Sequence, residues 1–357
     1  MLSTLMKLDI WSCDLKLTHE WTIASGLKTG GTNSSRVVLV KLSRNGLSGL
    51  GESSPSSRYG ETPETVTDFL RRIDPKKLSF EDIDASMRYL DTVAPKNLSA
   101  KSAINIALLD GAASKAGQAI YDFLGLGFTE KKHVTSFSIG IDKPDVIRKK
   151  VLEAEQYPIL KLKVGGPDDQ ENMQALREAA PHKTVRVDAN EGWTTKEEAL
   201  RNIEWLAQDG HIEFVEQPMP AGTPVADLKW LRERSPLPLY ADESFHRAND
   251  VAHCVECFHG VNGKLAKTGG VTAAFEALTA ARKAGLKTMF GCMIETSVLI
   301  SAAAHLAELC DHLDIDGNIL INNDPYLGVT AAKGMVSFAS TLEKTGLRVC
   351  PKNGASA

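Results

Sequence analysis

The sequence predicts an α/β protein in which a barrel of alternating strands and helices follows a smaller α+β domain. From about residue 133 onward, short apolar runs start at steps of roughly 22–29 residues, the length of one strand, one helix and two loops. Helical patterns lie between these runs, for example over 194–208 and 270–284. Periodicity alone also fits an open, doubly wound sheet, but no glycine-rich phosphate loop follows the first run. Eight such units therefore favour the barrel.

The first part of the chain carries a different, α+β pattern. We expect strands at about 5–17, 36–43 and 47–52 and helices near 62–73, 79–91 and 99–117. The second and third strands are expected to form a hairpin, because Asn45 and Gly46 between them favour a tight turn. Ser99 is the expected cap of the third helix, whose apolar residues recur on one face.

The barrel strands and the domain boundaries follow from the same patterns. The eight strands are expected at 135–139, 159–164, 184–188, 213–216, 237–241, 260–265, 287–290 and 312–315. We predict a capping domain over residues 1–130 and a barrel over 131–332. The tail, from about 333 to 357, is expected to return to the capping domain.

Composition and charge bound the class of protein. The chain has 357 residues, 43% of them hydrophobic, with a formal net charge of −4. This balance gives no reason to expect nucleic acid or a membrane surface as a partner. The first residues lack the apolar core of a signal peptide, and no apolar stretch is long enough for a membrane span. We therefore expect a cytoplasmic protein.

The six cysteines are scattered, which fits that compartment. Cys254 and Cys257 form a C-x-x-C pair that is compatible with a zinc site. No second Cys or His pair lies at a finger-like distance, so one helix that carries both cysteines is the favoured interpretation.

Three carboxylates stand at the ends of three consecutive predicted strands: Asp188, Glu216 and Asp242. In a barrel of this kind the C-terminal strand ends build the active site, so the three should converge. Three adjacent anions repel one another unless a cation lies between them. Oxygen ligands and the need for open positions favour Mg²⁺, and no His or Cys joins the set as zinc would prefer. Each carboxylate could instead cap the following helix, but three in register make that interpretation less favoured.

Lysines flank the predicted metal site. Lys161 and Lys163 alternate along one strand and therefore point to the same face, here the barrel interior, and Lys264 comes from the other side. A lysine near a bound cation should have a lowered pKa and can act as a general base. The alternative is that Lys161 and Lys163 form structural ion pairs with Asp188 and its neighbours, which we expect of one lysine but not of all three.

These groups together indicate proton abstraction next to a carboxylate. Such a proton is a very weak acid, because its removal yields a dianionic enediolate. A divalent cation and an ammonium group beside the carboxylate stabilise that charge where it develops. A lysine on each face then allows removal from one face and return to the other, which inverts the centre.

The motifs K-x-K, V-D-A-N, E-Q-P, A-D-E-S and K-x-x-K-x-G-G occur in this order at barrel spacing. In this combination the chain resembles the enolase superfamily, within it the muconate-lactonizing subgroup, and most closely the dipeptide epimerases of the L-Ala-D/L-Glu type. The resemblance implies a modified (β/α)₇β barrel of the TIM type with an N-terminal α+β capping domain. It implies Asp188, Glu216 and Asp242 as Mg²⁺ ligands and Lys163 and Lys264 as the two catalytic bases. It also implies homo-oligomeric assembly and Lys161 as a group that helps to hold the substrate carboxylate. In K-x-x-K we assign the first lysine, Lys264, and expect Lys267 to lie outside the inward position and to have a lesser role.

The last predicted strand separates the branches of the subgroup. Asp314-Ile315-Asp316 is similar to the D-x-D pair of dipeptide epimerases, and two carboxylates two residues apart suit the ammonium group of a dipeptide. This favours a Mg²⁺-dependent dipeptide epimerase that inverts the C-terminal residue. An o-succinylbenzoate synthase or an N-acylamino acid racemase remains the alternative, and a non-catalytic barrel is a third.

The resemblance places substrate side-chain recognition in two capping-domain loops, about 19–33 and 53–61. Lys28 and Arg58 could pair with an acidic C-terminal side chain, as in Ala-Glu epimerases, whereas Glu61 would suit a basic one. In the segment C-M-I-E-T, Met293 and Glu295 are further expected to lie near the substrate.

Overall fold

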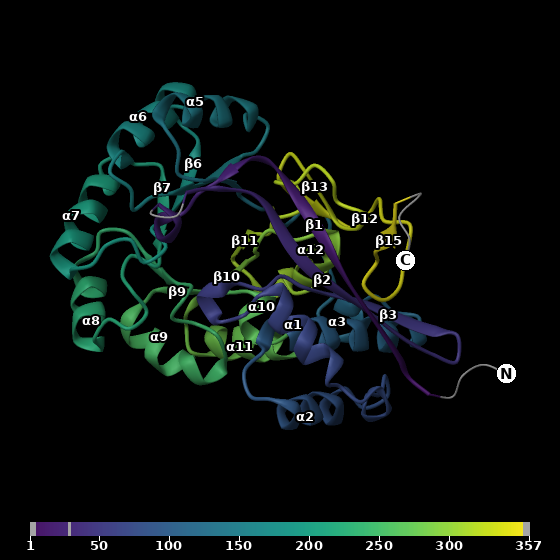
Figure 1. The fold of residues 1–357 in the computed structure, drawn as a ribbon. Coiled ribbons are helices and arrows are strands. Elements are labelled where there is room, and N and C mark those ends of the chain that lie inside the picture. The colour runs from purple at the N-terminus through teal and green to yellow at the C-terminus, as the bar shows by residue number, and fades with distance from the viewer. Residues whose placement is uncertain (1–4, 28–29, 353–357) are drawn as a thin grey trace.

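The computed structural model describes residues 5–27 and 30–352 and contains a parallel eight-stranded barrel with a capping layer (Figure 1). The strands follow one another around the barrel in chain order, from β4 to β11. Between the two end strands, a parallel bridge joins Thr135 to Leu313 and brings the barrel close to closure. The barrel architecture predicted from the sequence is confirmed.

The barrel strands lie close to the predicted runs. They are β4 (Phe137–Ile139), β5 (Ile159–Lys163), β6 (Thr184–Asp188), β7 (Ile212–Glu216), β8 (Leu239–Ala241), β9 (Gly260–Gly263), β10 (Lys287–Gly291) and β11 (His312–Asp314). The helices between them are α5 (Pro144–Glu153), α6 (Asp169–Ala179), α7 (Lys196–Ala207), α8 (Val225–Arg234), α9 (Val251–Cys257), α10 (Leu265–Thr268), α11 (Val271–Lys283) and α12 (Ser297–Ala304). The C-x-x-C pair lies on the single helix α9, with both cysteines buried.

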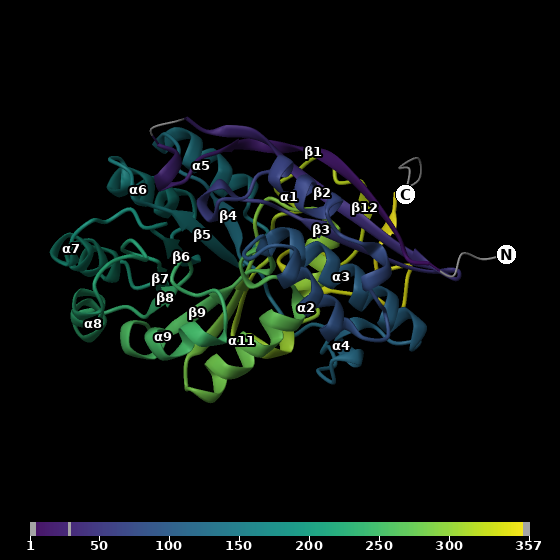
Figure 2. The same ribbon diagram turned by 60° about the horizontal axis from the view of Figure 1, so that its bottom comes forward.

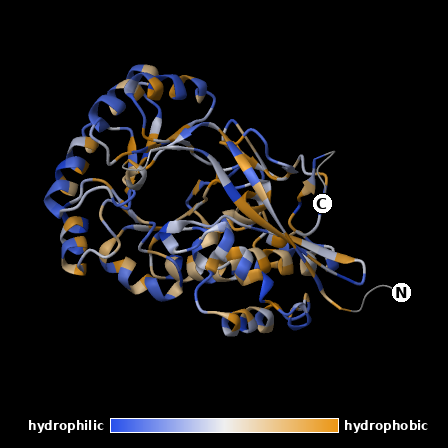
Figure 3. Ribbon diagram, viewed as in Figure 1, coloured by the Kyte–Doolittle hydropathy of each residue, from blue (hydrophilic) through white to orange (hydrophobic). Residues whose placement is uncertain are grey.

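Alternation along the strands separates two environments. On β6 and β7, Val185, Val187 and Val215 belong to the hydrophobic core cluster that the outer helices cover. The residues between them point the other way, so Phe214 is buried on the opposite face and packs against Tyr240, with ring centroids 4.1 Å apart. The same alternation places Glu216 two residues beyond Phe214, at the C-terminal strand end. The helices α5–α8 show mainly hydrophilic colours broken by hydrophobic stretches (Figure 3).

The capping layer is an antiparallel sheet with three helices. Its elements are β1 (Lys7–Trp21), β2 (Thr32–Arg44), β3 (Leu47–Ser53), α1 (Pro63–Arg71), α2 (Ile83–Val93) and α3 (Leu98–Lys115). The sheet crosses one end of the barrel (Figure 2). Its first strand is longer than predicted, because pairing with β2 continues past a register shift and ends at Trp21. This extension carries Trp21 to the mouth of the barrel.

Helix α3 lies between the sheet and the barrel and is buried almost all around. Glycines permit its close approach to β3: a Cβ atom at Gly51 would lie 1.9 Å from the carbonyl oxygen of Ala103. The predicted cap at Ser99 is wrong, since the helix begins at Leu98 after Asn97. The amide of Ser99 instead donates to the buried carboxylate of Glu61 at 2.9 Å.

The C-terminal segment contributes small antiparallel pairs, β12 (Tyr326–Leu327) with β15 (Cys350–Pro351) and β13 (Thr330–Ala332) with β14 (Met335–Ser337). Near its end, the amide of Leu347 donates to Asp110 of α3 at 2.7 Å. The predicted division into two domains, with this tail joined to the first, stays a prediction. No helix in the described part of the chain is both long and apolar enough to cross a membrane.

Candidate active site

Three buried carboxylates converge at the C-terminal ends of neighbouring strands. Asp188 ends β6, Glu216 ends β7 and Asp242 follows β8, and all three side chains have no exposed surface. One oxygen of each lies within 4.8 Å of one oxygen of the others. Burial, together with the charge of Asp188, raises the pKa of Glu216 to about 7. Such mutual repulsion is what a bound cation relieves.

The set fits a hard divalent ion. All ligand atoms offered are carboxylate oxygens, and the described residues contain no other cluster of His, Cys, Asp or Glu with metal-binding geometry. Mg²⁺ prefers oxygen ligands and commonly uses a few carboxylates while leaving positions for water and substrate. Asp188, Glu216 and Asp242 are therefore the residues that would hold it.

Neighbouring groups fix the orientation of these carboxylates. The amide nitrogen Nδ2 of Asn262 donates to Glu216 at 2.7 Å, and the Gln217 side chain accepts from the backbone N–H of Asp242 at 2.9 Å. Lys267 donates to both the side chain and the backbone carbonyl of Asp242. Gln217 itself has a left-handed backbone, φ +35°, which turns the chain immediately after Glu216.

Three lysines face the carboxylates from two sides of the barrel. Lys163 on β5 donates to Asp188 at 2.6 Å, and Lys264, directly after β9, donates to Asp242 at 2.7 Å. Burial would lower the pKa of Lys264, but Asp242 and other nearby acids raise it well above its usual value. Lys163 also lies 6.0 Å from the ring centroid of Trp21, at the mouth of the barrel. Both lysines line the same cavity.

Lys161 differs from the other two lysines because it lies among three carboxylates at once. Its side chain is 1% exposed and its Nζ lies 2.6 Å from Asp314, 2.7 Å from Glu216 and 3.1 Å from Asp188. Burial lowers its pKa, but the three carboxylates more than offset this and raise it well above the usual range. Lys161 is therefore a fixed cation, suited to holding an anionic group rather than accepting a proton.

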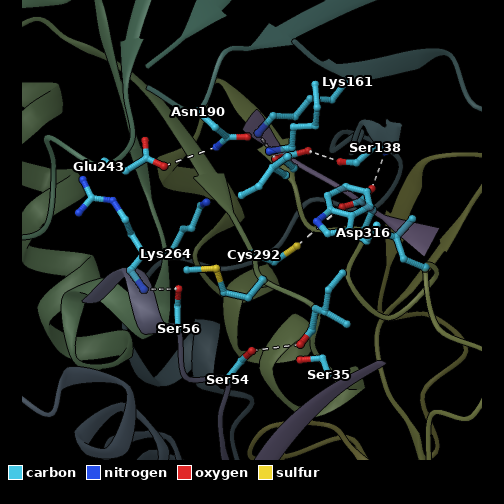
Figure 4. Close-up of a pocket in the computed structure, with 18 of the residues that line it drawn as sticks. Ser35, Ser54, Ser56, Ser138, Lys161, Asn190, Glu243, Lys264, Cys292 and Asp316 are labelled. Atoms are coloured by element: carbon cyan, nitrogen blue, oxygen red, sulfur yellow. Dashed lines mark hydrogen bonds and ion pairs between the residues drawn. The ribbon is translucent and has the colours of Figure 1, made fainter. Parts of the chain in front are cut away.

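A cavity of about 240 Å³ lies above these groups, between the strand ends and the capping loops. Figure 4 shows two sides to it, with Asn190, Glu243 and Lys264 on one and Ser138, Cys292 and Asp316 on the other. We call the first the metal end, because Asn190 and Glu243 adjoin the carboxylate-bearing strand ends. The second is the Asp316 end.

The predicted pair Asp314 and Asp316 lines the cavity, but its two members have different partners. Asp314 accepts from Lys161 at 2.6 Å and from Ser136 at 2.6 Å, and although burial opposes it, the lysine holds its pKa down at about 2. Asp316 accepts from the backbone N–H of Ser138 at 2.6 Å, and no lysine of the described residues lies within ion-pair distance of it. Burial and the adjacent Asp314 raise its pKa to about 6.

Of the remaining predicted residues, two line the cavity, two are buried away from it, and one lies outside the described residues. Met293 and Arg58 line the cavity. Glu295 is buried and accepts from the backbone N–H of Met293 at 3.0 Å, but it is not among the described residues that line the cavity. Glu61 is buried at the start of α3, so its charge does not face a substrate. Lys28 lies outside the described residues.

Several residues at the site were missed or undervalued from the sequence. Lys267 was expected to lie outside the inward position, but the chain turns into α10 after β9 and returns its Nζ to Asp242. Asn262 could have been found, since it lies two residues before Lys264 and therefore on the same face of the strand. Trp21 and Glu191 carry no comparable signal, because Trp21 ends β1 and Glu191 lies in the loop after β6. Ser138 lies in the middle of the short strand β4, where a serine by itself indicates no function.

Known proteins are similar to this chain in sequence and in fold. The family model of the mandelate racemase / muconate lactonizing enzyme N-terminal domain matches residues 16–125, and the enolase C-terminal domain-like model matches residues 147–354. The chain belongs to the enolase superfamily. A superfamily relative, the L-Ala-D/L-amino acid epimerase of Pedosphaera parvula, is 65% identical over 97% of this chain and 100% of its own length.

Two further members of the superfamily extend the likeness. The L-Ala-D/L-Glu epimerase of Bacteroides thetaiotaomicron is 39% identical over 93% of this chain and 85% of its own. The dipeptide epimerase of Enterococcus faecalis, whose crystal structure is a complex with Mg and L-Leu-L-Tyr, has a TM-score of 0.86 at 30% identity. That likeness covers 98% of this chain and 99% of the other. This chain is accordingly an isomerase of the racemase and epimerase type.

Proposed function

We propose that the protein is a Mg²⁺-dependent dipeptide epimerase that inverts the α-carbon of the C-terminal residue by 1,1-proton transfer. One observation carries the proposal. Lys163 and Lys264 line a single cavity from strands β5 and β9, which lie on different sides of the three-carboxylate cluster. A substrate carbon held between them has a proton acceptor on one face and a proton donor on the other.

Each residue of the site has a separate role in this proton transfer. Lys161, as a fixed cation, holds the substrate carboxylate, and Asp188, Glu216 and Asp242 hold the ion. When bound, Mg²⁺ supplies positive charge beside that carboxylate and thereby makes the adjacent C–H bond more acidic. One lysine, in its neutral form, removes the α-proton, and the ammonium of the other returns a proton to the opposite face. The negative charge of Asp242 is the main influence that raises the pKa of Lys264. A cation bound to Asp242 would neutralise that charge and so remove this influence.

The Asp316 end suits the free amino group of a dipeptide. Asp316 carries a carboxylate into the cavity, and its partners there are the N–H of Ser138 and, at 3.7 Å, the thiol of Cys292. An ammonium group near it would form a charge-assisted hydrogen bond in a largely buried place. The relatives support a dipeptide as substrate, since they are named for L-Ala-D/L-amino acids, for L-Ala-D/L-Glu and for a complex with L-Leu-L-Tyr.

Proton exchange tests this function directly. The protein is incubated in D₂O with Mg²⁺ and a set of L,L-dipeptides, and the α-protons are followed by NMR. We expect deuterium at the C-terminal α-carbon, together with the appearance of the L,D-diastereomer. Absence of deuterium there in every dipeptide would contradict the proposal.

An o-succinylbenzoate synthase or N-acylamino acid racemase is a second candidate, because it would use the same metal site and lysines. The ion pair between Lys161 and Asp314 is the observation that supports this candidate. Because Lys161 already neutralises Asp314, only Asp316 remains to bind an ammonium group. Asp316→Asn distinguishes the two. A dipeptide epimerase should lose about 10- to 100-fold in kcat/KM, as expected for a lost charge-assisted bond, whereas the alternatives should keep their activity. Cytoplasmic location and a homo-oligomeric state stay predictions from the sequence.

A further inference from the structure

An ion pair spans the metal end of the cavity. Arg58, from the capping loop that follows β3, donates to Glu191 through Nε at 2.8 Å and through Nη2 at 2.6 Å. Glu191 belongs to the loop after β6 and has a left-handed backbone, φ +66°. Both side chains line the cavity. The pair is bidentate, the arrangement that fixes a guanidinium most firmly.

Glu191 is held in place independently of Arg58. Its Oε1 also accepts from the backbone N–H of Ala221 at 2.7 Å, and its side chain is 16% exposed against 48% for Arg58. Arg58 therefore contacts a carboxylate that is already positioned. A substrate carboxylate that displaced Glu191 from Arg58 would leave the Glu191 carboxylate without its cation. Two carboxylates would then lie side by side in a half-buried place, which is unfavourable.

The position of the pair relates it to one part of the substrate. This step rests on the proposed function, in which the substrate carboxylate lies at the three-carboxylate cluster and the amino group lies near Asp316. The C-terminal residue then occupies the metal end, where Figure 4 shows Asn190 and Glu243. Glu191 follows Asn190 in the chain and is bound by Arg58, so the ion pair lies at that end, and the C-terminal side chain is the part of a dipeptide that meets it.

We propose that the Arg58–Glu191 ion pair keeps Arg58 from binding an acidic C-terminal side chain and Glu191 from binding a basic one, so that the pair itself favours uncharged C-terminal side chains. Every lysine or arginine among the described cavity-lining residues has a carboxylate within ion-pair distance, and Arg58 follows that rule. An acidic side chain at this end therefore finds no unpaired cation among these described residues, and at Arg58 it meets the carboxylate of Glu191. A basic side chain meets Arg58 and finds no unpaired carboxylate in Glu191. The pair acts against both charges.

Charge-altering variants with matched substrates test this selection. L-Ala-L-Gln and L-Ala-L-Glu differ in charge but little in shape, and L-Ala-L-Met and L-Ala-L-Lys are the second pair. Exchange of the C-terminal α-proton in D₂O gives kcat/KM for each. We expect wild type to favour Gln over Glu. Glu191→Gln frees Arg58. It should raise the kcat/KM for L-Ala-L-Glu relative to that for L-Ala-L-Gln on the order of 10-fold, as one charge-assisted hydrogen bond would.

The reverse change should act on the other pair of substrates. Arg58→Gln frees the Glu191 carboxylate and should raise the kcat/KM for L-Ala-L-Lys relative to that for L-Ala-L-Met. The double variant should return both ratios of kcat/KM to near the wild-type values. Glu178→Gln is the control, because it breaks an Arg–Glu pair with Arg148 on exposed helix surfaces outside the cavity. It should leave both ratios unchanged.

The possible failures are distinguishable. If the wild type exchanges no dipeptide, the proposed function and this inference are both overturned. If exchange is intact but neither Glu191→Gln nor Arg58→Gln moves its ratio, only the selection by the ion pair is overturned. Should one of the two variants not fold, as judged by its circular dichroism and Tm, the other decides.

Discussion

Lys163 and Lys264 are the two residues on which inversion depends. They approach the cavity from β5 and from the end of β9, and each is paired with a different carboxylate, Asp188 or Asp242. We expect Lys163→Gln and Lys264→Gln each to reduce epimerisation by about 10²- to 10⁴-fold, the usual contribution of a general acid or base. The two variants should differ in which diastereomer still exchanges its α-proton, because each retains one base.

Measurement of exchange separately from the L,L- and the L,D-dipeptide checks this assignment. The lysine that faces a given α-proton remains in one variant and is missing in the other, so their patterns should be complementary. Lys267→Gln is the comparison, since Lys267 contacts Asp242 but does not line the cavity. It should weaken both exchanges equally. The same loss of both exchanges in all three variants would contradict opposed bases.

At this scale the sequence was informative where one residue per strand carries the function. Asp188, Glu216 and Asp242 follow the rule that strand ends of a barrel meet, so their convergence could be expected. The partners of Arg58 and Asp314 could not be expected in the same way. Glu191 reaches Arg58 across 133 residues and Lys161 reaches Asp314 across 153, and only the folded chain brings these groups together.

The helix α12 ends at a histidine whose protonation is coupled to folding. His305 is buried, accepts from the backbone N–H of Tyr121 through Nδ1 at 3.3 Å and contacts the carbonyl oxygen of Leu347 through Nε2 at 3.1 Å. The neutral ring with its proton on Nε2 satisfies both contacts, whereas a second proton on Nδ1 would face a donor. Burial accordingly lowers the pKa of His305 to about 3.

The sign of the pH effect follows from that shift. Between about pH 6.5 and pH 3 the unfolded chain binds a proton at His305 and the folded chain does not, so stability falls as the pH falls. From pH 7 to pH 5 this should cost about 2 kcal/mol, at about 1.4 kcal/mol for each unit below 6.5. His305→Gln lacks this contribution. Urea unfolding of both proteins at the two pH values should show a smaller loss for the variant, and parallel losses would contradict a neutral His305.

Elements of the barrel could be predicted more closely than those of the cap. The barrel strands β5 to β7 are short, apolar on their outer faces and each followed by a helix, so they lie within a residue or so of their predicted bounds. The end of β1 was missed because pairing with β2, and not the local pattern, carries it to Trp21. The start of α3 was missed for a similar reason, since the carboxylate of the distant Glu61 accepts from the N–H groups of Ser99 and Ala100 in the first turn.

At the scale of the whole molecule, buried side chains join the cap to the barrel. Glu52, at the end of β3, accepts from the backbone N–H groups of Thr296 and Leu299 at 3.0 and 3.3 Å and so caps α12. Such a carboxylate at a helix N-terminus is stabilised by the backbone donors and the helix dipole. The contact spans 244 residues of sequence, so its existence follows only from the tertiary fold.

The metal site should stabilise the molecule as a whole, because its ligands come from three different strand ends. Mg²⁺ that binds the folded chain and not the unfolded one adds about 2.7 kcal/mol at 100 times its Kd, which raises the Tm by several degrees. Thermal unfolding with and without MgCl₂, at ionic strength matched with NaCl, measures the effect without any substrate. Asp188→Asn removes one ligand and should abolish most of the increment. Asp227→Asn, in an ion pair with Lys196 away from the cluster, should keep it. An equal rise in Tm for wild type and Asp188→Asn would show that the ion acts elsewhere, and then the three carboxylates would need another explanation for their close approach.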